Sequence, residues 1–314
     1  MQTGYIGLTD PDWYSFLLSQ PKIDEVNFWQ PHGGRAFKAL NQSDIFFFKL
    51  RAPYKLIAGF GFFQRYESLP AWLAWDSFGK MNGAASYDEM VDSICKLRGI
   101  DAAQNLSGDF QIGCIMLTAP VFFAKDEQIN PPSDWAKTGI QQGKKYDLTH
   151  GEGYRIMNQC LEQAKNSKRY WNIQQNPSAI TTRYGEPTII TPRLGQGIFS
   201  LEVRDAYQSA CAVTREHSTP VLEAAHILPY SRGGEHRVDN GILLRRDLHR
   251  LFDLGYVTIT PDYKFRVGSR LRKEFHNGRC YYDMDEQTIA LPENGLLRPN
   301  KDFLEWHEKK VFKV

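Results

Sequence analysis

Four polar residues in the last third of the chain have side chains suited to acid–base and metal chemistry. His226 is followed by Asn240, nine residues later by His249 and four residues after that by Asp253. A neutral imidazole can take a proton from water near pH 7, and an imidazole with a carboxylate can bind a divalent cation. Each residue alone is more often structural, as an Asn-Gly turn or a solvated helix pair. Their combination favours a metal-assisted reaction.

The apolar pattern around these residues predicts the elements that hold them. Residues 221–229 ("VLEAAHILP") and 240–246 ("NGILLRR") have the length and composition of strands, and a Gly-Gly pair lies in the connection between them. Residues 246–255 have an apolar helical face and end in a glycine. The sequence therefore predicts strand, loop, strand and helix. On that helix His249 and Asp253 point the same way, because they are four residues apart.

Composition excludes several classes of protein. The chain has 314 residues, 42% hydrophobic and 24% charged, with a net charge of +2, which is typical of a globular protein and too small to indicate nucleic acid by itself. The five cysteines form no CxxC pair, which argues against a zinc-finger framework and a disulfide scaffold. The N-terminus lacks the pattern of a signal peptide and the apolar runs are too short to span a bilayer, so we expect a cytoplasmic protein.

The first half of the chain has short strand-like runs with helices between them. The strand-length runs are residues 5–10, 25–31, 44–50, 56–63 and 111–123, and helical spacing occurs at 11–20 and 86–98. This pattern predicts an α+β fold with a small, curled mixed sheet or barrel. Residues 151–172 look helical and lead into a polar segment. We therefore expect a domain over residues 1–150, a helical linker over 151–190 and a second domain over 191–314.

The motifs of the second domain resemble those of the HNH endonucleases, which contain a ββα-metal finger. The elements "AAHILPYS" and "NGILLRRDLHRLFD", with "CAVT" upstream, occur in the family's order, and the resemblance covers about residues 192–310. It implies that His226 is the general base and that Asn240 fixes the loop over the finger. It also implies that His249 is a metal ligand and that Asp253 falls where some members have a further ligand.

One position departs from that family pattern. Many members have an Asp or His ligand directly before the catalytic histidine, where this chain has Ala225. Glu223 lies on the same face of the predicted strand and is the candidate replacement ligand. The resemblance implies one divalent metal ion per finger. A carboxylate suits Mg²⁺ or Mn²⁺, and the histidine also permits Zn²⁺, Ni²⁺ or Co²⁺.

Local charge supports a phosphate partner. Residues 231–274 contain ten Lys or Arg and six Asp or Glu, a local charge of +4. Basic side chains beside the finger are suited to contact the DNA backbone without reading its sequence. The candidates are Arg232, Arg245, Arg246 and Arg250.

The first domain resembles an EVE domain of the PUA superfamily over about residues 3–145. The resemblance lies in the order of "YIGLTDPDWYSFL", "VNFW", "LNQSDIFFFKL", "LIAGFGFF" and "AWDSFG". Members of that family accommodate a modified base in an aromatic pocket. A flipped base needs stacking rings and polar partners, and Trp13 and Trp29 lie next to polar residues. The candidate pocket residues are Trp29 with Asn27, then Trp13 and Asp10.

Together the two resemblances imply a modification-dependent restriction endonuclease. Its substrate would be double-stranded DNA carrying 5-methylcytosine or 5-hydroxymethylcytosine, with the modified base flipped into the first domain. A homodimer would account for double-strand cleavage, because a single finger cuts one strand. Two alternatives stay open. One is an HNH nuclease that acts on unmodified DNA. The other is a binding protein for modified nucleic acid with a degenerate finger, which Ala225 favours.

Overall fold

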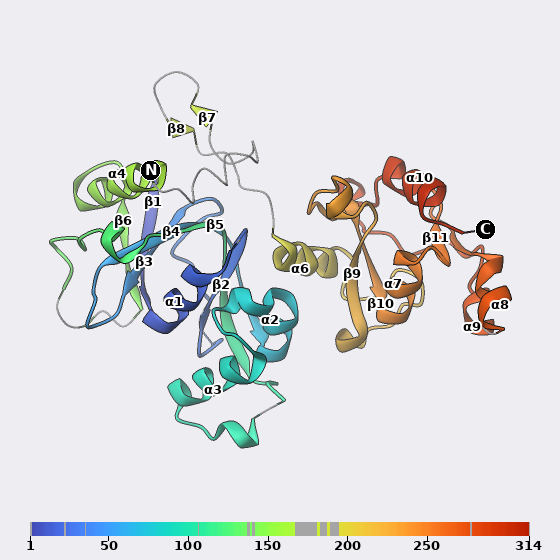
Figure 1. Cartoon of the computed structure of the whole chain (residues 1–314), viewed down its shortest axis with the longest axis horizontal. Helices are drawn as coiled ribbons and strands as arrows, with labels where there is room; N and C mark the ends of the chain where they lie inside the picture. The colour runs from blue at the N-terminus through green and yellow to red at the C-terminus, as the bar shows by residue number, and fades with distance from the viewer. Residues whose placement is uncertain are drawn as a thin grey trace. The chain divides into compact units, whose positions relative to one another are not determined.

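The chain folds into two compact units, residues 1–193 and 194–314, each described here by itself (Figure 1). The computed structural model describes residues 2–21, 23–34, 36–105, 107–136, 139, 142–166, 181–182, 187–188, 195–276 and 278–313. Within these residues no helix is long and apolar enough to cross a membrane.

A six-stranded mixed sheet forms the centre of the first unit. In spatial order its strands are β2 (Glu25–Gln30), β5 (Gln111–Phe122), β4 (Ile57–Pro70), β3 (Ile45–Leu50), β1 (Thr3–Thr9) and β6 (Gly143–Asp147). β1 pairs parallel with β3, and the other neighbouring pairs are antiparallel. The predicted α+β class is confirmed. The predicted closed barrel is not shown, because within the described residues the sheet ends in two edge strands, β2 and β6.

Helices cover both faces of this sheet (Figure 1). On one face α1 (Pro11–Ser19) packs in a cluster with Phe46 and Phe48, and on the other α4 (Gly151–Asn166) packs in a cluster with Phe47. Successive residues of β3 point to opposite faces. Because both faces are covered, β3 has no polar side and reads as the continuous apolar run "IFFF".

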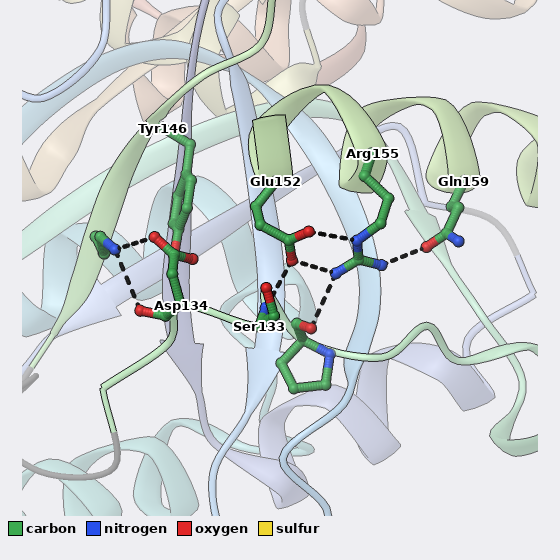
Figure 2. A network of polar contacts seen from close by, with 8 residues as sticks. Ser133, Asp134, Tyr146, Glu152, Arg155 and Gln159 are labelled. Carbon is green, nitrogen blue, oxygen red and sulfur yellow. Dashed lines mark hydrogen bonds and ion pairs between the residues drawn. The ribbon is translucent and has the colours of Figure 1, made fainter. Parts of the chain in front are cut away.

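A polar network fastens α4 and the loop before β6 to each other (Figure 2). The Glu152 carboxylate accepts hydrogen bonds from the Arg155 guanidinium at 2.8 and 3.0 Å and from the Ser133 backbone N–H at 2.6 Å. The Tyr146 hydroxyl of β6 donates to Asp134 at 2.8 Å, and burial, followed by this bond, raises the pKa of Tyr146 to about 12. α4 is therefore integral to the first unit, although we predicted it as the start of a linker. Half of that linker, residues 167–180, 183–186 and 189–190, lies outside the described residues.

The remaining elements of the first unit connect or flank the sheet. The helices are α2 (Ala71–Phe78) and α3 (Tyr87–Arg98), with 3-10 turns η1 (Gly79–Asn82), η2 (Ala102–Gln104) and η3 (Lys125–Glu127), and a two-stranded pair β7 (Thr181–Thr182) and β8 (Pro187–Thr188). The Ser86 side chain caps α3, and Gly99 ends it in the left-handed conformation.

The second unit is built around a hairpin and a helix. Its strands are β9 (Leu222–His226), β10 (Gly241–Arg245), β11 (Val257–Ile259) and β12 (Phe265–Val267). Its helices are α6 (Gln196–Ala206), α7 (Arg246–Asp253), α8 (Ser269–Phe275), α9 (Arg279–Tyr282) and α10 (Lys301–Lys310), with 3-10 turns η4 (Thr219–Val221), η5 (Tyr230–Arg232), η6 (Val238–Asn240) and η7 (Gly295–Leu297). Leu248 and Phe252 of α7 are buried with Ile242 and Leu244 of β10. The predicted order of strand, loop, strand and helix is confirmed.

Candidate functional site

His226 lies at the end of β9, against helix α6. Its ring stacks on Phe199 with centroids 4.1 Å apart and planes at 17°. Gly241, directly opposite His226 across the hairpin, lets α6 approach this closely, because a Cβ there would lie 2.4 Å from Val203 and 2.9 Å from Phe199. The close approach of α6 to the hairpin thus holds the imidazole of His226 against Phe199.

The surroundings of His226 keep its imidazole neutral. Burial, followed by the neighbouring charges of His236 and His249, lowers the pKa of His226 to about 4. Near pH 7 the ring therefore carries an unprotonated nitrogen that can accept a proton. Its Nε2 lies 2.9 Å from Nδ1 of His236 in the connection between the strands.

Asn240 is fully buried and holds that connection in place. Its Oδ1 accepts from the Leu228 backbone N–H at 2.9 Å. Its Nδ2 donates to the Leu228 carbonyl at 3.0 Å and to the Glu235 carbonyl at 2.9 Å. All the side-chain bonds go to backbone groups, so Asn240 fixes the loop rather than contacting a ligand.

His249 projects from α7 between two carboxylates. Its Nδ1 lies 2.8 Å from Glu223 Oε2, and its Nε2 lies 3.5 Å from Asp253 Oδ2. The other Glu223 oxygen pairs with Arg246 at 2.8 Å. With Nδ1–H donating to Glu223, the Nε2 lone pair and the Asp253 carboxylate face one another. A proton or a cation is needed between two such acceptors.

This pair fits a divalent cation that takes its other ligands from water and substrate. Donor atoms bound to one cation at about 2 Å lie roughly 3 to 4 Å apart, which agrees with the separation of Nε2 and Oδ2. Glu223 on the second nitrogen of His249 corresponds to the carboxylate partner that metal-bound histidines usually have. Among the described residues no group of three or more His, Cys, Asp or Glu side chains forms a complete metal site.

Residues 211–260 match the family model described as HNH endonuclease. The match spans the β9–β10 hairpin, its connection and α7. We call these matched residues the HNH segment. The HNH segment therefore includes His226, Asn240 and His249 in the order that the motifs indicated. A comparison with proteins of curated function gives no match.

Two solved structures are similar to this chain at a low level. An ASCH protein mutant from Zymomonas mobilis is 11% identical with a TM-score of 0.33, over 49% of this chain and 96% of that one. The modification-dependent restriction endonuclease TagI is 11% identical with a TM-score of 0.32, over 93% of this chain and 77% of that one. At this level of similarity neither likeness defines a function.

The four candidate arginines of the HNH segment differ in whether they form ion pairs with carboxylates. Arg245 forms two hydrogen bonds with Asp247, one of 2.6 and one of 2.9 Å, and Arg246 pairs with Glu223. Arg232 and Arg250 are exposed, and neither has a carboxylate partner among the described residues. These last two are the better placed to neutralise phosphates.

In the first unit, Asn27 and Trp29 of β2 meet at Asn82. Asn27 Nδ2 donates to Asn82 Oδ1 at 2.8 Å, and the Trp29 indole N–H donates to the Asn82 carbonyl at 2.9 Å. Trp13 is 6% exposed and lies among phenylalanines, with its ring centroid 5.4 Å from that of Phe28. Of the four predicted pocket residues, Asn27 and Trp13 thus lie deep in the fold, and Trp29 is half-buried.

Asp10, the fourth, has a different role. Its carboxylate accepts from the backbone N–H groups of Asp12 at 2.8 Å and Trp13 at 3.3 Å, so it caps α1.

Two residues that the sequence did not single out join these groups. His236 contacts the ring of His226, and Asn82 connects Asn27 with Trp29. The connection between the predicted strands contains a histidine in addition to His226 and His249, and this was a sequence signal for His236. Asn82 carried no such signal, because its partners come from β2, more than fifty positions away.

Proposed function

We propose that this protein is a metal-assisted DNA endonuclease that cleaves DNA carrying modified cytosine. The observation that carries the nuclease proposal is a neutral, immobilised His226 in an HNH segment that also presents the His249–Asp253 pair. A fixed base beside a cation-binding pair is the arrangement that phosphodiester hydrolysis requires.

In the proposed reaction His226 is the general base. Its free nitrogen takes a proton from water, the water oxygen bonds to phosphorus, and the bond from phosphorus to the 3′ oxygen breaks. The leaving oxygen then takes a proton from solvent. Asn240 keeps the connection around His226 closed, and Glu223 orients His249 through Nδ1. A divalent cation held by His249 and Asp253 would supply neutralising charge for the phosphate and the leaving oxygen.

The proposal of base reading is supported by two buried polar atoms in the first unit. The Trp13 indole N–H and Asn27 Oδ1 have no hydrogen-bond partner among the described residues. Buried polar groups without partners are rare and require an explanation. Both adjoin the turn at Asn82 and Gly83, since a Cβ on Gly83 would lie 2.0 Å from the Trp13 ring. We propose that this turn shifts to admit a flipped base, whose polar edge pairs with these atoms.

Cleavage of matched DNA duplexes tests the proposed function. The duplexes carry cytosine, 5-methylcytosine, 5-hydroxymethylcytosine or its glucosylated form, each with Mg²⁺, Mn²⁺ or Ni²⁺. We expect cleavage of a modified duplex only, its loss with EDTA, and binding without cleavage by His226→Ala. Cleavage of unmodified DNA at the same rate would exclude modification dependence. Loss of binding as well as cleavage in His226→Ala would contradict the division of roles between the units.

The second candidate is a non-catalytic reader of modified nucleic acid. It is favoured by Ala225, which is buried and leaves the position before His226 without a ligand. Selective binding of modified DNA with no cleavage in any of the three metals would favour this function.

A further inference from the structure

A second histidine, His236, contacts the proposed base. It lies in the connection between β9 and β10, and its Nδ1 is 2.9 Å from Nε2 of His226. Its ring stacks on Tyr230 with centroids 4.9 Å apart and planes at 10°. His226 is held on its other side by Phe199. The two imidazoles thus form a hydrogen-bonded pair between two aromatic rings.

The connection that carries His236 has little freedom to move. Asn240 bonds to the Glu235 carbonyl, directly before His236, at 2.9 Å. Gly234 passes so close to the Leu228 carbonyl that a Cβ would lie 1.9 Å from its oxygen. The contact between the two histidines is therefore set by the backbone of the loop and not by a flexible side chain alone.

This contact determines which nitrogen of His226 is available for chemistry. Nε2 faces His236, whereas Nδ1 has no partner among the described residues. A water molecule must therefore be deprotonated by Nδ1, and Nδ1 must then carry a lone pair. For Nδ1 to carry this lone pair in the neutral ring, the proton must be on Nε2, from which it would donate to His236 Nδ1. In the opposite tautomer Nδ1 would carry the proton and could not act as a base.

We propose that His236 is a positioning residue for the nuclease reaction. It accepts the hydrogen bond from Nε2–H of His226 and so fixes both the tautomer and the ring orientation of the base. After His226 has taken a proton from water, Nε2–H still donates to His236, so the contact is kept through the step. This inference depends on the proposed function, in which His226 is the base.

Two substitutions separate the hydrogen bond from the packing. His236→Phe keeps a ring beside Tyr230 and Phe199 but removes the acceptor nitrogen. His236→Asn places the acceptor Oδ1 near the position of Nδ1. We expect His236→Phe to lower kcat by about 10- to 100-fold with KM unchanged, the same range as for loss of a partner that orients a metal-bound histidine. We expect His236→Asn to recover part of the loss. His217→Phe, the same change at an exposed histidine of this unit, is the control.

Nitrogen-15 NMR of histidine-labelled full-length protein provides a readout that does not need cleavage. Spectra with EDTA at pH 7.5 report which ring nitrogen carries the proton, and the His226 signals are assigned by their loss in His226→Ala. We expect Nε2–H in the wild type and in His236→Asn, and a mixture of tautomers in His236→Phe.

The outcomes are distinct for the two proposals. Unchanged kcat in His236→Phe, an equal loss in His236→Asn, or an Nδ1–H tautomer in the wild type would each overturn the role of His236. A wild-type protein that cleaves none of the test duplexes refutes the nuclease function. The tautomer of His226 would still decide whether His236 fixes the ring.

Discussion

Glu223 and His249, on adjacent elements β9 and α7, are joined by a 2.8 Å contact between a carboxylate oxygen and Nδ1. The contact leaves Nε2 of His249 as the nitrogen that can bind a cation, beside Asp253. We therefore propose that Glu223, predicted from the sequence as a replacement ligand, instead orients the proposed ligand His249. Its second oxygen is taken by Arg246.

This interpretation predicts different effects for the two carboxylates. Asp253→Ala removes a proposed ligand and should weaken Mn²⁺ binding by about 10- to 100-fold or more. Glu223→Gln keeps an oxygen that accepts from Nδ1–H and should weaken Mn²⁺ binding by less than about 10-fold. The loss in Glu223→Ala should lie between those of Glu223→Gln and Asp253→Ala. Isothermal titration with Mn²⁺ measures all three. A larger loss in Glu223→Gln than in Asp253→Ala would mean that Glu223 is itself a ligand.

Arg250 is predicted to contact the DNA backbone by charge. Arg250→Ala should weaken binding of modified and unmodified DNA equally and reduce the slope of log affinity against log salt by about 1. Arg250→Lys keeps the charge and serves as the matched control. Fluorescence anisotropy from 50 to 200 mM salt, about the range over which this effect is large, gives the slopes. An unchanged slope in Arg250→Ala would exclude a phosphate contact.

Asn27 is predicted to support discrimination between bases. Asn27→Ala removes the buried acceptor, and we expect it to reduce the preference for modified over unmodified DNA by about 10-fold, as for loss of one buried hydrogen bond. Asp10→Asn, which keeps a side chain able to cap α1, should leave the preference unchanged. Competition binding measures the ratio, and circular dichroism checks folding. An Asn27→Ala protein that is folded and still selective would remove Asn27 from the pocket.

His307 of α10 is predicted to make the second unit sensitive to acid. Its ring stacks on Phe252 with centroids 3.6 Å apart, its Nδ1 lies 2.8 Å from the Thr258 hydroxyl, and its Nε2 lies 3.1 Å from the Phe252 carbonyl. Burial lowers the pKa of His307 to about 4, although the hydrogen bond to Phe252 acts in the opposite direction. The ring is therefore neutral in the folded protein.

The sign of the pH effect follows from this lowered pKa. Between the unfolded value of about 6.5 and about 4, the unfolded chain binds more protons than the folded one, so stability falls as the pH is lowered through that window. The loss is on the order of 3 kcal/mol in the free energy of unfolding. His307→Gln should remove this part of the pH dependence. Urea unfolding of the wild type and of His307→Gln from pH 7.5 to 4.5 measures this pH dependence. The same pH dependence of the free energy of unfolding in the two proteins would contradict the assignment to His307.

The hairpin and α7 were predictable because their signals are local. The short apolar runs of the strands, the helical spacing of Leu248 and Phe252, and Gly255 with φ of +77° at the helix end all lie within a few residues of the elements they define. The contacts of Glu223 and His236 were not predictable, because each depends on how separate elements pack. The pairing of β6 with β1 was not predictable either, because it joins residues 3–7 with residues 143–147, which are far apart in the sequence.

The linker prediction illustrates the same limit. Residues 151–166 have the pattern of an amphipathic helix, and the sequence does not say what covers the apolar side. The cluster that covers it includes Ile6, Ile45 and Phe47, more than one hundred positions earlier in the chain. The helix was therefore predicted as part of a linker, because the residues that pack against it are distant in the sequence.

Ile156, Met157 and Cys160 of α4 pack against the sheet, and this limits where the chain can be truncated. A fragment severed after residue 150 would expose Phe47 and its neighbours to water and should aggregate. Autonomous folding of the N-terminal part requires the polypeptide to continue at least to the end of α4 at Asn166.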